Sequence, residues 1–171
     1  MKHINIEIKA KCNNQGKIRS ILNSLNADFK GVDHQIDTYF EVNEGRLKLR
    51  EGNIENYLIY YKRGNQKGPK QSNVILFEIT RNSSLKDILI NSLKVLAVVD
   101  KKREIYFIEN VKFHIDVVKV LGNFIEIEAI DKSGKIGKEK LLKQCKRYLK
   151  SFGIPEKDLI EGSYSDLLLK K

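Results

Sequence analysis

Charged residues recur at every second position of several short segments, and this alternation is the strongest chemical signal in the chain. The residues that could do chemistry are the acids Glu7, Glu126 and Glu128 and the bases Lys9, Arg46, Lys48, Arg50, Lys62, Lys70, Lys101 and Arg103. Because successive side chains of a strand point to opposite faces, such segments have one apolar face and one charged face. Both signs of charge on one sheet predict a surface for a multiply charged ligand and its metal.

The acidic residues are of the type that binds a hard divalent cation. Glu7 alternates with Ile6 and Ile8 near the start of the chain, and Glu126 and Glu128 alternate with apolar residues near its end. Mg²⁺ usually binds through one or two carboxylates together with substrate phosphates. The pattern is equally compatible with a solvated sheet face, so the spacing leaves both interpretations open.

The basic residues lie on or beside predicted strands, with Lys48 and Arg50 on one face and Lys101 and Arg103 on another. A triphosphate has many oxygens that need donors, for which arginine offers a rigid fork and lysine a point charge. The alternative is that these side chains only improve solubility. That alternative is weakened because lysine is depleted in strands, yet it recurs here.

Asp116 lies at the centre of a predicted strand, where it could act as a general base, polarise a lysine, bind metal or pair with a neighbouring cation. The three histidines, His3, His34 and His114, show no metal-ligand spacing and are expected to be ordinary. Neither G-x-x-x-x-G-K-[ST] nor G-x-G-x-x-G occurs, so the sequence supports neither a P-loop nor a dinucleotide-binding site.

The composition fits one folded domain over residues 1–171. Hydrophobic residues make up 41% of the chain and charged residues 32%, and the formal net charge is +10. This balance favours anionic partners such as phosphate esters, nucleic acid or an anionic membrane, although solubility alone could explain it. Cys12 and Cys145 lie far apart, which predicts free thiols in a reducing compartment. With no signal peptide or membrane-spanning stretch in the sequence, we expect a soluble, cytoplasmic protein.

The coarse pattern predicts eight strands and three main helices. The strands are expected at residues 3–11, 29–41, 47–51, 56–63, 73–81, 98–109, 111–120 and 123–130. The helices are expected at 17–25, 85–96 and 136–152, with a short terminal helix at 164–169, and residues 64–72 form the clearest loop. Short turns between successive strands favour an antiparallel α+β sheet. Such a sheet could stay open, with its polar face in water, or close into a barrel around a charged channel.

The order of these motifs resembles the CYTH superfamily, the triphosphate tunnel metalloenzymes. The segments that carry the resemblance are Asn5-Ile6-Glu7-Ile8-Lys9 (family E-x-E-x-K), Asp37-Thr38-Tyr39-Phe40, Gly45-Arg46-Leu47-Lys48-Leu49-Arg50, Tyr61-Lys62, Lys101-Lys102-Arg103, His114-Ile115-Asp116, Leu121-Gly122-Asn123-Phe124-Ile125-Glu126-Ile127-Glu128 and Ser163-Tyr164-Ser165-Asp166-Leu167-Leu168. A lone E-x-E-x-K is weak evidence, whereas ordered matches along nearly the whole chain are strong.

The resemblance implies a closed, eight-stranded antiparallel tunnel with a charged lumen, helices outside, a triphosphate substrate and Mg²⁺ or Mn²⁺. By position, it assigns metal binding to Glu7, Glu126, Glu128 and Asn5, phosphate binding to Lys9, Arg46, Lys48, Arg50, Lys62 and Lys70, and the catalytic step to Asp116, Lys101 and Arg103. Asn5 departs from the family, because an amide replaces the first glutamate and should weaken metal binding. Lys70, in the expected loop, could swing over the tunnel mouth.

The family resemblance implies a metal-dependent enzyme acting on a triphosphate, with class IV adenylyl cyclase activity favoured by the Ser163–Leu168 tail. Hydrolysis of inorganic or thiamine triphosphate and non-catalytic binding of nucleotide or polyphosphate remain open. The expected partner is a small-molecule triphosphate rather than nucleic acid or a membrane, and a homodimer is compatible with the family.

Overall fold

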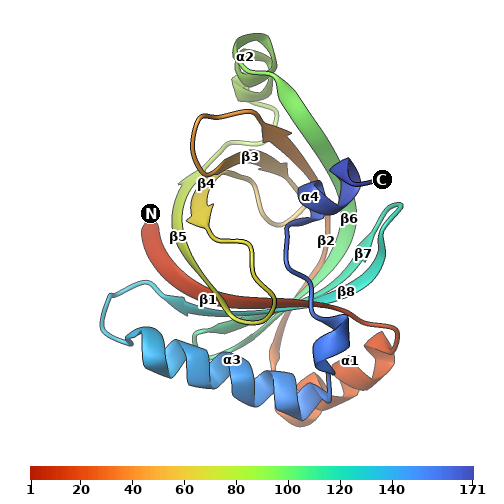
Figure 1. Cartoon of the computed structure of the whole chain (residues 1–171). Helices are drawn as coiled ribbons and strands as arrows, with labels where there is room; N and C mark the ends of the chain where they lie inside the picture. Colours follow the sequence, from red (N-terminus) through yellow and green to blue (C-terminus); the bar gives the residue numbers. More distant parts are fainter.

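Eight strands form a closed antiparallel barrel in the computed structural model, which describes residues 1–171. The strands are β1 (Lys2–Lys11), β2 (Asp28–Phe40), β3 (Arg46–Glu51), β4 (Tyr57–Arg63), β5 (Lys70–Glu78), β6 (Val95–Ile108), β7 (Val111–Val118) and β8 (Gly122–Asp131). They follow the order β1-β5-β4-β3-β2-β6-β7-β8 around the barrel, and β8 pairs with β1 to close it (Figure 1). The predicted α+β fold with an eight-stranded closed barrel is therefore confirmed.

Four α-helices pack against this barrel. They are α1 (Gln15–Ser24), α2 (Leu85–Ser92), α3 (Lys138–Phe152) and α4 (Tyr164–Leu169). Helices α1 and α3 lie beneath β1 and β8, and α4 lies beside β6 (Figure 1). No helix is both long enough and apolar enough to cross a membrane.

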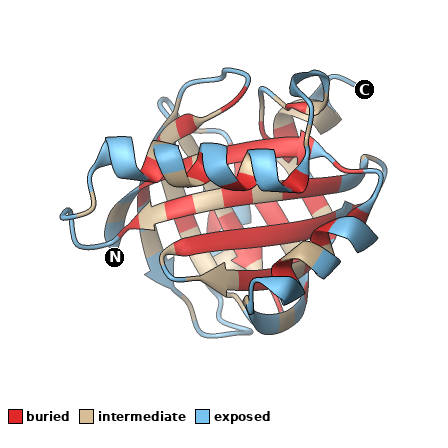
Figure 2. Cartoon of the chain, turned by 90° about the horizontal axis from the view of Figure 1, so that it is seen from below, coloured by how far each residue is buried: buried red, intermediate tan, exposed pale blue.

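The main hydrophobic core lies outside the barrel wall, between the strands and helices α1 and α3. Ile6 and Ile8 of β1 and Phe113 of β7 point outward and pack with Leu141 and Phe152 of α3. Figure 2 shows this side, with buried residues on the strands and on the helix faces that cover them. Since the apolar positions of β1, β7 and β8 are used on the outside, the polar positions between them must face the lumen.

Local signals explain where the helices begin and end. The Asn14 side chain accepts a hydrogen bond from the Lys17 amide at 3.0 Å, as expected of an N-cap. Helix α3 ends at Gly153, whose φ of 65° suits glycine. At the start of α4, Ser163 and Asp166 form a capping box. These caps fix the direction in which the C-terminal segment leaves α3 and returns to the barrel.

Several predicted boundaries are wrong: strand β5 ends at Glu78 rather than at residue 81, and β6 begins at Val95 rather than at residue 98. Strand β5 begins at Lys70 rather than at residue 73, because Lys70 already pairs with Glu7 of β1. The preceding loop is correspondingly shorter, and Lys70 belongs to the barrel wall. Helix α2 ends at Ser92, four residues early, because the apolar run that follows enters β6 at Val95.

Candidate functional site

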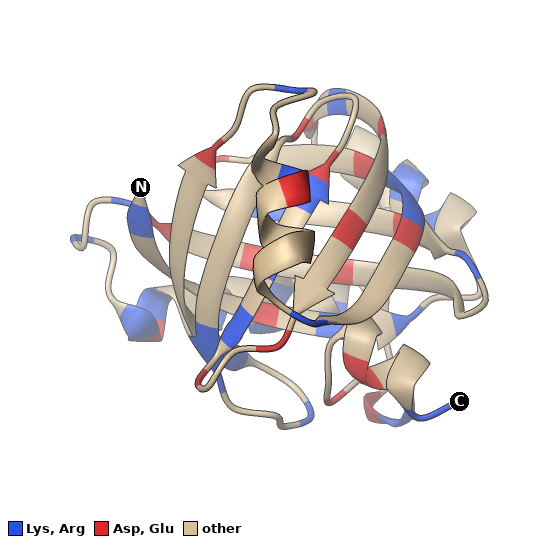
Figure 3. Cartoon of the chain, turned by 90° about the horizontal axis from the view of Figure 1, so that it is seen from above, with Lys and Arg blue, Asp and Glu red and all other residues tan.

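The lumen of the barrel holds a cavity of about 450 Å³, lined by 28 residues of which 10 are hydrophobic. Acidic and basic positions lie side by side along the strands that surround it (Figure 3). On β1, the lining residues are His3, Asn5, Glu7 and Lys9, the alternate positions to those in the outer core. The charged face that the sequence predicted is therefore the inner face of a tunnel.

Three oxygen-bearing side chains cluster on β1 and β8. Glu7 and Glu128 lie directly opposite one another in the strand pairing, and the Asn5 amide nitrogen donates to Glu128. The Oδ1 atom of Asn5 is buried without a partner. Burial raises the pKa of Glu128, and the nearby charges of Glu7 and Glu126 add to the rise against the opposing effect of Lys112. Glu128 is thus a buried carboxylate whose ionised form is not fully compensated by the cations around it.

Glu126 occupies the next inward position on β8 and already has three partners. Its carboxylate lies 2.7 Å from Lys9 Nζ, 2.7 Å from Arg103 Nη2 and 2.9 Å from His114 Nδ1. Burial opposes ionisation of Glu126, but Lys9, Arg103 and His114 outweigh it and hold its pKa well below the usual value. Burial, with Arg103 and Lys112, lowers the pKa of His114 to about 3, so this imidazole is neutral at pH 7. His114 also lines the cavity, contrary to the expectation that it has no role in the site.

The donor set of Asn5, Glu7 and Glu128 fits a hard divalent cation. Each supplies oxygen, the atom type that Mg²⁺ and Mn²⁺ prefer, and the crowded carboxylates and the unpartnered amide oxygen would be relieved by a cation. In the structure Glu7 pairs with Arg63 while Asn5 donates to Glu128, and no three His, Cys, Asp or Glu residues converge on a common point. Glu126 fits this set less well because its charge is already neutralised by Lys9 and Arg103.

Asp37 gathers three of the predicted basic residues on the opposite wall. Lys48 Nζ lies 2.9 Å, Arg50 Nε 2.8 Å and Lys101 Nζ 2.6 Å from its carboxylate. Burial disfavours the charged form of Asp37, but Arg50, Lys101 and Lys48 together hold its pKa well below the usual value. Burial lowers the pKa of Lys101, which is fully enclosed and does not line the cavity. Lys48 and Arg50 do line the cavity, so they can contact a ligand. Lys101 pairs with Asp37 without lining the cavity and holds this carboxylate in place.

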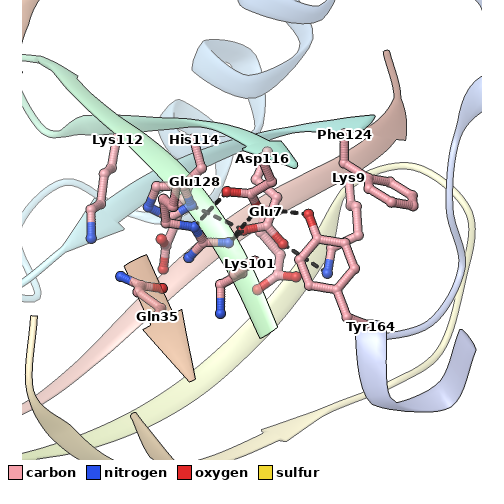
Figure 4. Close-up of polar contacts among 12 residues, drawn as sticks. Glu7, Lys9, Gln35, Lys101, Lys112, His114, Asp116, Phe124, Glu128 and Tyr164 are labelled. Atoms are coloured by element: carbon pink, nitrogen blue, oxygen red, sulfur yellow. Dashed lines mark hydrogen bonds and ion pairs between the residues drawn. The ribbon is translucent and has the colours of Figure 1, made fainter. Parts of the chain in front are cut away.

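Arg103 is held by a second carboxylate, Asp116. The guanidinium donates to both oxygens of Asp116 at 2.7 Å and 2.6 Å, and the Tyr164 hydroxyl donates to the same carboxylate at 2.7 Å. Lys9 Nζ lies 3.7 Å from the centre of the Tyr164 ring (Figure 4). Asp116 is fully buried and does not line the cavity. Its contacts favour positioning of Arg103 over direct action on a substrate.

The phosphate-binding role predicted for Lys62 is at odds with its position. Lys62 lies on the outer face, half-exposed, where it pairs with Glu44. Its neighbour Arg63 points into the lumen instead, is almost fully buried and donates to Glu7. The Nε and Nη2 atoms of Arg63 are buried without a partner. Since strand side chains alternate, Tyr61 and Arg63 share the inner face and Lys62 cannot join them.

Lys70 and Arg46, the two remaining phosphate-binding candidates, lie at one end of the tunnel against the C-terminal segment. Lys70 Nζ donates to the Ile160 carbonyl at 2.7 Å, and Arg46 lies 2.9 Å from Asp166. Neither lines the cavity. Burial lowers the pKa of Lys70 to about 8. The expectation that Lys70 swings over the mouth is therefore wrong, because its ammonium group is buried and anchored.

Sequence reasoning missed several lumen residues. Glu55 comes from the β3–β4 connection, pairs with Arg50 at 2.9 Å and with Lys112, and lines the cavity. Tyr164 was overlooked as a site residue although it lies in a segment quoted for the family resemblance, and Arg63 was overlooked although it directly follows the quoted Tyr61-Lys62. Lys112 shares a strand face with His114 and Asp116, so its alternation with apolar residues was the signal that could have revealed it.

Comparison with known proteins decides the family. The CYTH domain matches residues 3–164. The chain belongs to the CYTH family. MJ0240 of Methanocaldococcus jannaschii, named as a candidate adenylate cyclase, is 29% identical over 180 residues, which cover 96% of this chain and 98% of the relative. The PH1012 protein of Pyrococcus horikoshii OT3 has 27% identity and a TM-score of 0.79, with 95% of this chain and 98% of that chain covered.

A second solved structure shows the same fold at lower sequence identity. HpAC1 from Hippeastrum, a candidate adenylyl cyclase described as having a dominant triphosphatase activity, has 14% identity, a TM-score of 0.62 and coverage of 98% of this chain and 95% of that chain. CYTH proteins are adenylyl cyclase-like enzymes or triphosphatases and bind triphosphate substrates. Belonging to CYTH therefore connects the charged tunnel with triphosphate chemistry.

Proposed function

We propose that the chain is a divalent-metal-dependent enzyme that acts on a nucleoside triphosphate, of the class IV adenylyl cyclase type. The observation that carries the proposal is an enclosed cavity in which cationic groups surround a small carboxylate–amide cluster. Arg63 presents two unpartnered donors there, and Lys48, Arg50 and Lys9 line the same space. This arrangement is suited to a polyphosphate chain carrying a divalent cation.

In the proposed reaction, the 3′ hydroxyl oxygen of ATP attacks the α-phosphorus and the bond to the β-phosphate oxygen breaks. The products are cyclic AMP, pyrophosphate and a proton. Lys9, Lys48, Arg50 and Arg63 bind the phosphate oxygens and stabilise the negative charge that moves to the leaving pyrophosphate. Asp37 keeps Lys48 and Arg50 in place and Asp116 keeps Arg103 in place, which pre-organises the electrostatic field.

Asn5, Glu7 and Glu128 are the residues that we propose to hold Mg²⁺ or Mn²⁺, with Glu126 beside them. When bound, the ion would neutralise phosphate charge and orient the polyphosphate. Hydrolysis at a terminal phosphate would use the same binding groups with water as the nucleophile. The two reactions therefore differ in how the substrate is placed rather than in how its phosphates are held.

A substrate panel tests this proposal. The purified chain is incubated with ATP, inorganic triphosphate or thiamine triphosphate and with Mg²⁺ or Mn²⁺, and the products are separated by ion-exchange chromatography. We expect cyclic AMP and pyrophosphate from ATP. Phosphate release without cyclic AMP would establish a triphosphatase instead, and no product from any substrate would refute the enzyme and favour a binding module.

A matched pair of variants controls for contaminating activity. Glu126→Gln removes the charge that Lys9 and Arg103 share, whereas Glu139→Gln makes the same change on the exposed surface of α3. A hydrogen bond to a charged group contributes about 1.5–3 kcal/mol, so product formation should fall by at least about tenfold in the first variant and stay unchanged in the second.

A further inference from the structure

The two ends of the tunnel are built differently. At one end the C-terminal segment lies across the lumen: Ser163 and Tyr164 line the cavity, and Lys70 and Arg46 hold this segment through Ile160 and Asp166. At the other end the cavity is lined by residues exposed to solvent, namely Met1, Glu78 and Lys132. A ligand therefore enters from the Met1 end, and its leading part meets the basic residues.

Next to the open end, one wall of the lumen is apolar. Ile59 and Val74 form a buried cluster with Tyr61, and Tyr57 and Leu76 pack against it. All five belong to the neighbouring strands β4 and β5, and all line the cavity. The remaining lining of this end includes the apolar side chains of Phe107 and Ile130.

This apolar wall is not explained by binding of phosphate. A triphosphate chain presents charged oxygens over its whole surface, and apolar surface facing a hydrated lumen gains nothing from it. The same surface would be stabilised if an apolar group of a ligand covered it, because that group would remove it from water. The cavity volume of about 450 Å³ lies within the range of roughly 300–1,000 Å³ that small organic molecules occupy in proteins.

Polar atoms at this end offer hydrogen bonds to a flat heterocycle. His3 Nδ1 is buried without a partner, and His3 lines the cavity beside Val74, its partner in the pairing of β1 with β5. A neutral imidazole can donate or accept a hydrogen bond. Glu55 and Lys112 lie at the same end and are paired with each other, which limits competition from full charges.

We propose that the apolar side chains near the open end, Tyr57, Ile59 and Leu76 of β4 and β5 together with Phe107 of β6, form a subsite for the heterocycle of an organic triphosphate. It follows that the ligand lies along the tunnel with its phosphates at the Arg63 end and its heterocycle near the opening. The inference rests on the proposed function, since the heterocycle is positioned by the phosphates. Inorganic triphosphate has no heterocycle, so it would leave this subsite empty and bind less tightly than an organic triphosphate.

Binding measurements on neighbouring residues of β5 test the subsite. Leu76 faces the lumen, whereas Phe77 is 65% exposed on the outer face. Isothermal titration calorimetry in the presence of Mg²⁺ measures the dissociation constants of three ligands: α,β-methylene ATP, its guanine analogue and inorganic triphosphate. Each ligand is titrated into the native chain and into the variants Leu76→Ala and Phe77→Ala. We expect the native chain to bind at least one nucleotide more tightly than inorganic triphosphate, and Leu76→Ala to weaken that nucleotide about tenfold. Inorganic triphosphate should bind all three proteins within twofold.

The outcomes separate this inference from the proposed function. Equal affinity for nucleotide and inorganic triphosphate in the native chain, or equal weakening of both by Leu76→Ala, would overturn the subsite while leaving the triphosphate site intact. Binding of neither ligand to the native chain would refute the proposed function itself. A Phe107→Ala variant provides a second measurement from another strand if Leu76→Ala unfolds, with the same nucleotide-specific loss expected.

Discussion

Replacement of Arg63 by alanine should weaken triphosphate turnover by about two orders of magnitude. The Arg63 side chain is 3% exposed and has one guanidinium nitrogen on Glu7, while Nε and Nη2 are buried without partners. These two donors are available to phosphate oxygens. Each charge-assisted hydrogen bond contributes about 1.5–3 kcal/mol, and a net loss of about 3 kcal/mol corresponds to a decrease in kcat/KM of roughly a hundredfold.

The neighbouring residue provides the control. Lys62→Ala removes the same charge one position earlier, but its side chain is half-exposed on the outer face and its pair with Glu44 is solvated. Such exposed pairs contribute little, so kcat/KM should change by less than about twofold. Arg63→Lys keeps the charge but loses the planar fork, which places its expected loss between these two.

The assay is steady-state kinetics on the preferred triphosphate over a range of substrate concentrations, with thermal unfolding of each variant to confirm folding. The reasoning is refuted if Lys62→Ala lowers kcat/KM strongly while Arg63→Ala, folded as the native chain is, leaves it within about threefold. That result would mean that β4 presents the opposite face to the lumen.

Three further predictions concern stability, pH and metal. Phe113→Ala should lower the free energy of unfolding by about 3–5 kcal/mol in chemical denaturation, and Phe77→Ala by less than about 0.5, because only Phe113 is in the core beneath α3. Burial opposes ionisation of Asp166, but the Ser163 amide and Arg46 lower its pKa. The stabilisation of α4 is therefore full above the usual aspartate pKa and is lost as pH falls through the lowered value. Hydrogen exchange should show this loss in the native chain and in an Asp158→Asn control, whereas Asp166→Asn should show weak α4 protection at every pH. Chelation should abolish activity, Mg²⁺ or Mn²⁺ should restore it, and Glu128→Gln should need several-fold more Mg²⁺ for half-maximal rate; activity that persists in chelator would contradict the metal proposal.

Alternation predicted the barrel strands because its period of two depends only on strand geometry. It also placed Glu7 with Lys9 and Glu126 with Glu128 on shared faces, as the structure has them. Alternation does not identify the inner face of β4, because polar and apolar residues do not alternate there. In Tyr60-Tyr61-Lys62-Arg63 both final residues are basic, and only the pairing of Arg63 with Ser72 and of Lys62 with Asn73 decides which one faces the lumen.

Other parts of the site depend on contacts between distant segments. Glu55 lies in the β3–β4 connection, and its partner Lys112 is 57 residues away on β7. Tyr164 reaches Asp116 only because the C-terminal segment crosses the end of the barrel. Local periodicity does not predict such contacts between residues that are far apart in the sequence. The same holds for Lys70, whose burial follows from the register of β5 against β1.

The lumen is less positive than the chain as a whole, which has consequences for how an anion would bind. Seven lysines and arginines line the cavity against six aspartates and glutamates, whereas the whole chain carries a net charge of +10. An excess of positive charge therefore cannot account for binding of a triphosphate in the lumen. The buried lysines and arginines must instead release a carboxylate partner and bind a phosphate oxygen in its place. Enclosed pairs are screened little by salt, while binding of nucleic acid to exposed lysines is screened strongly. We therefore expect the affinity for triphosphate to fall far less than that for RNA between 50 and 200 mM salt, as measured by calorimetry. Parallel losses for both ligands would show that triphosphate binds at the outer surface instead.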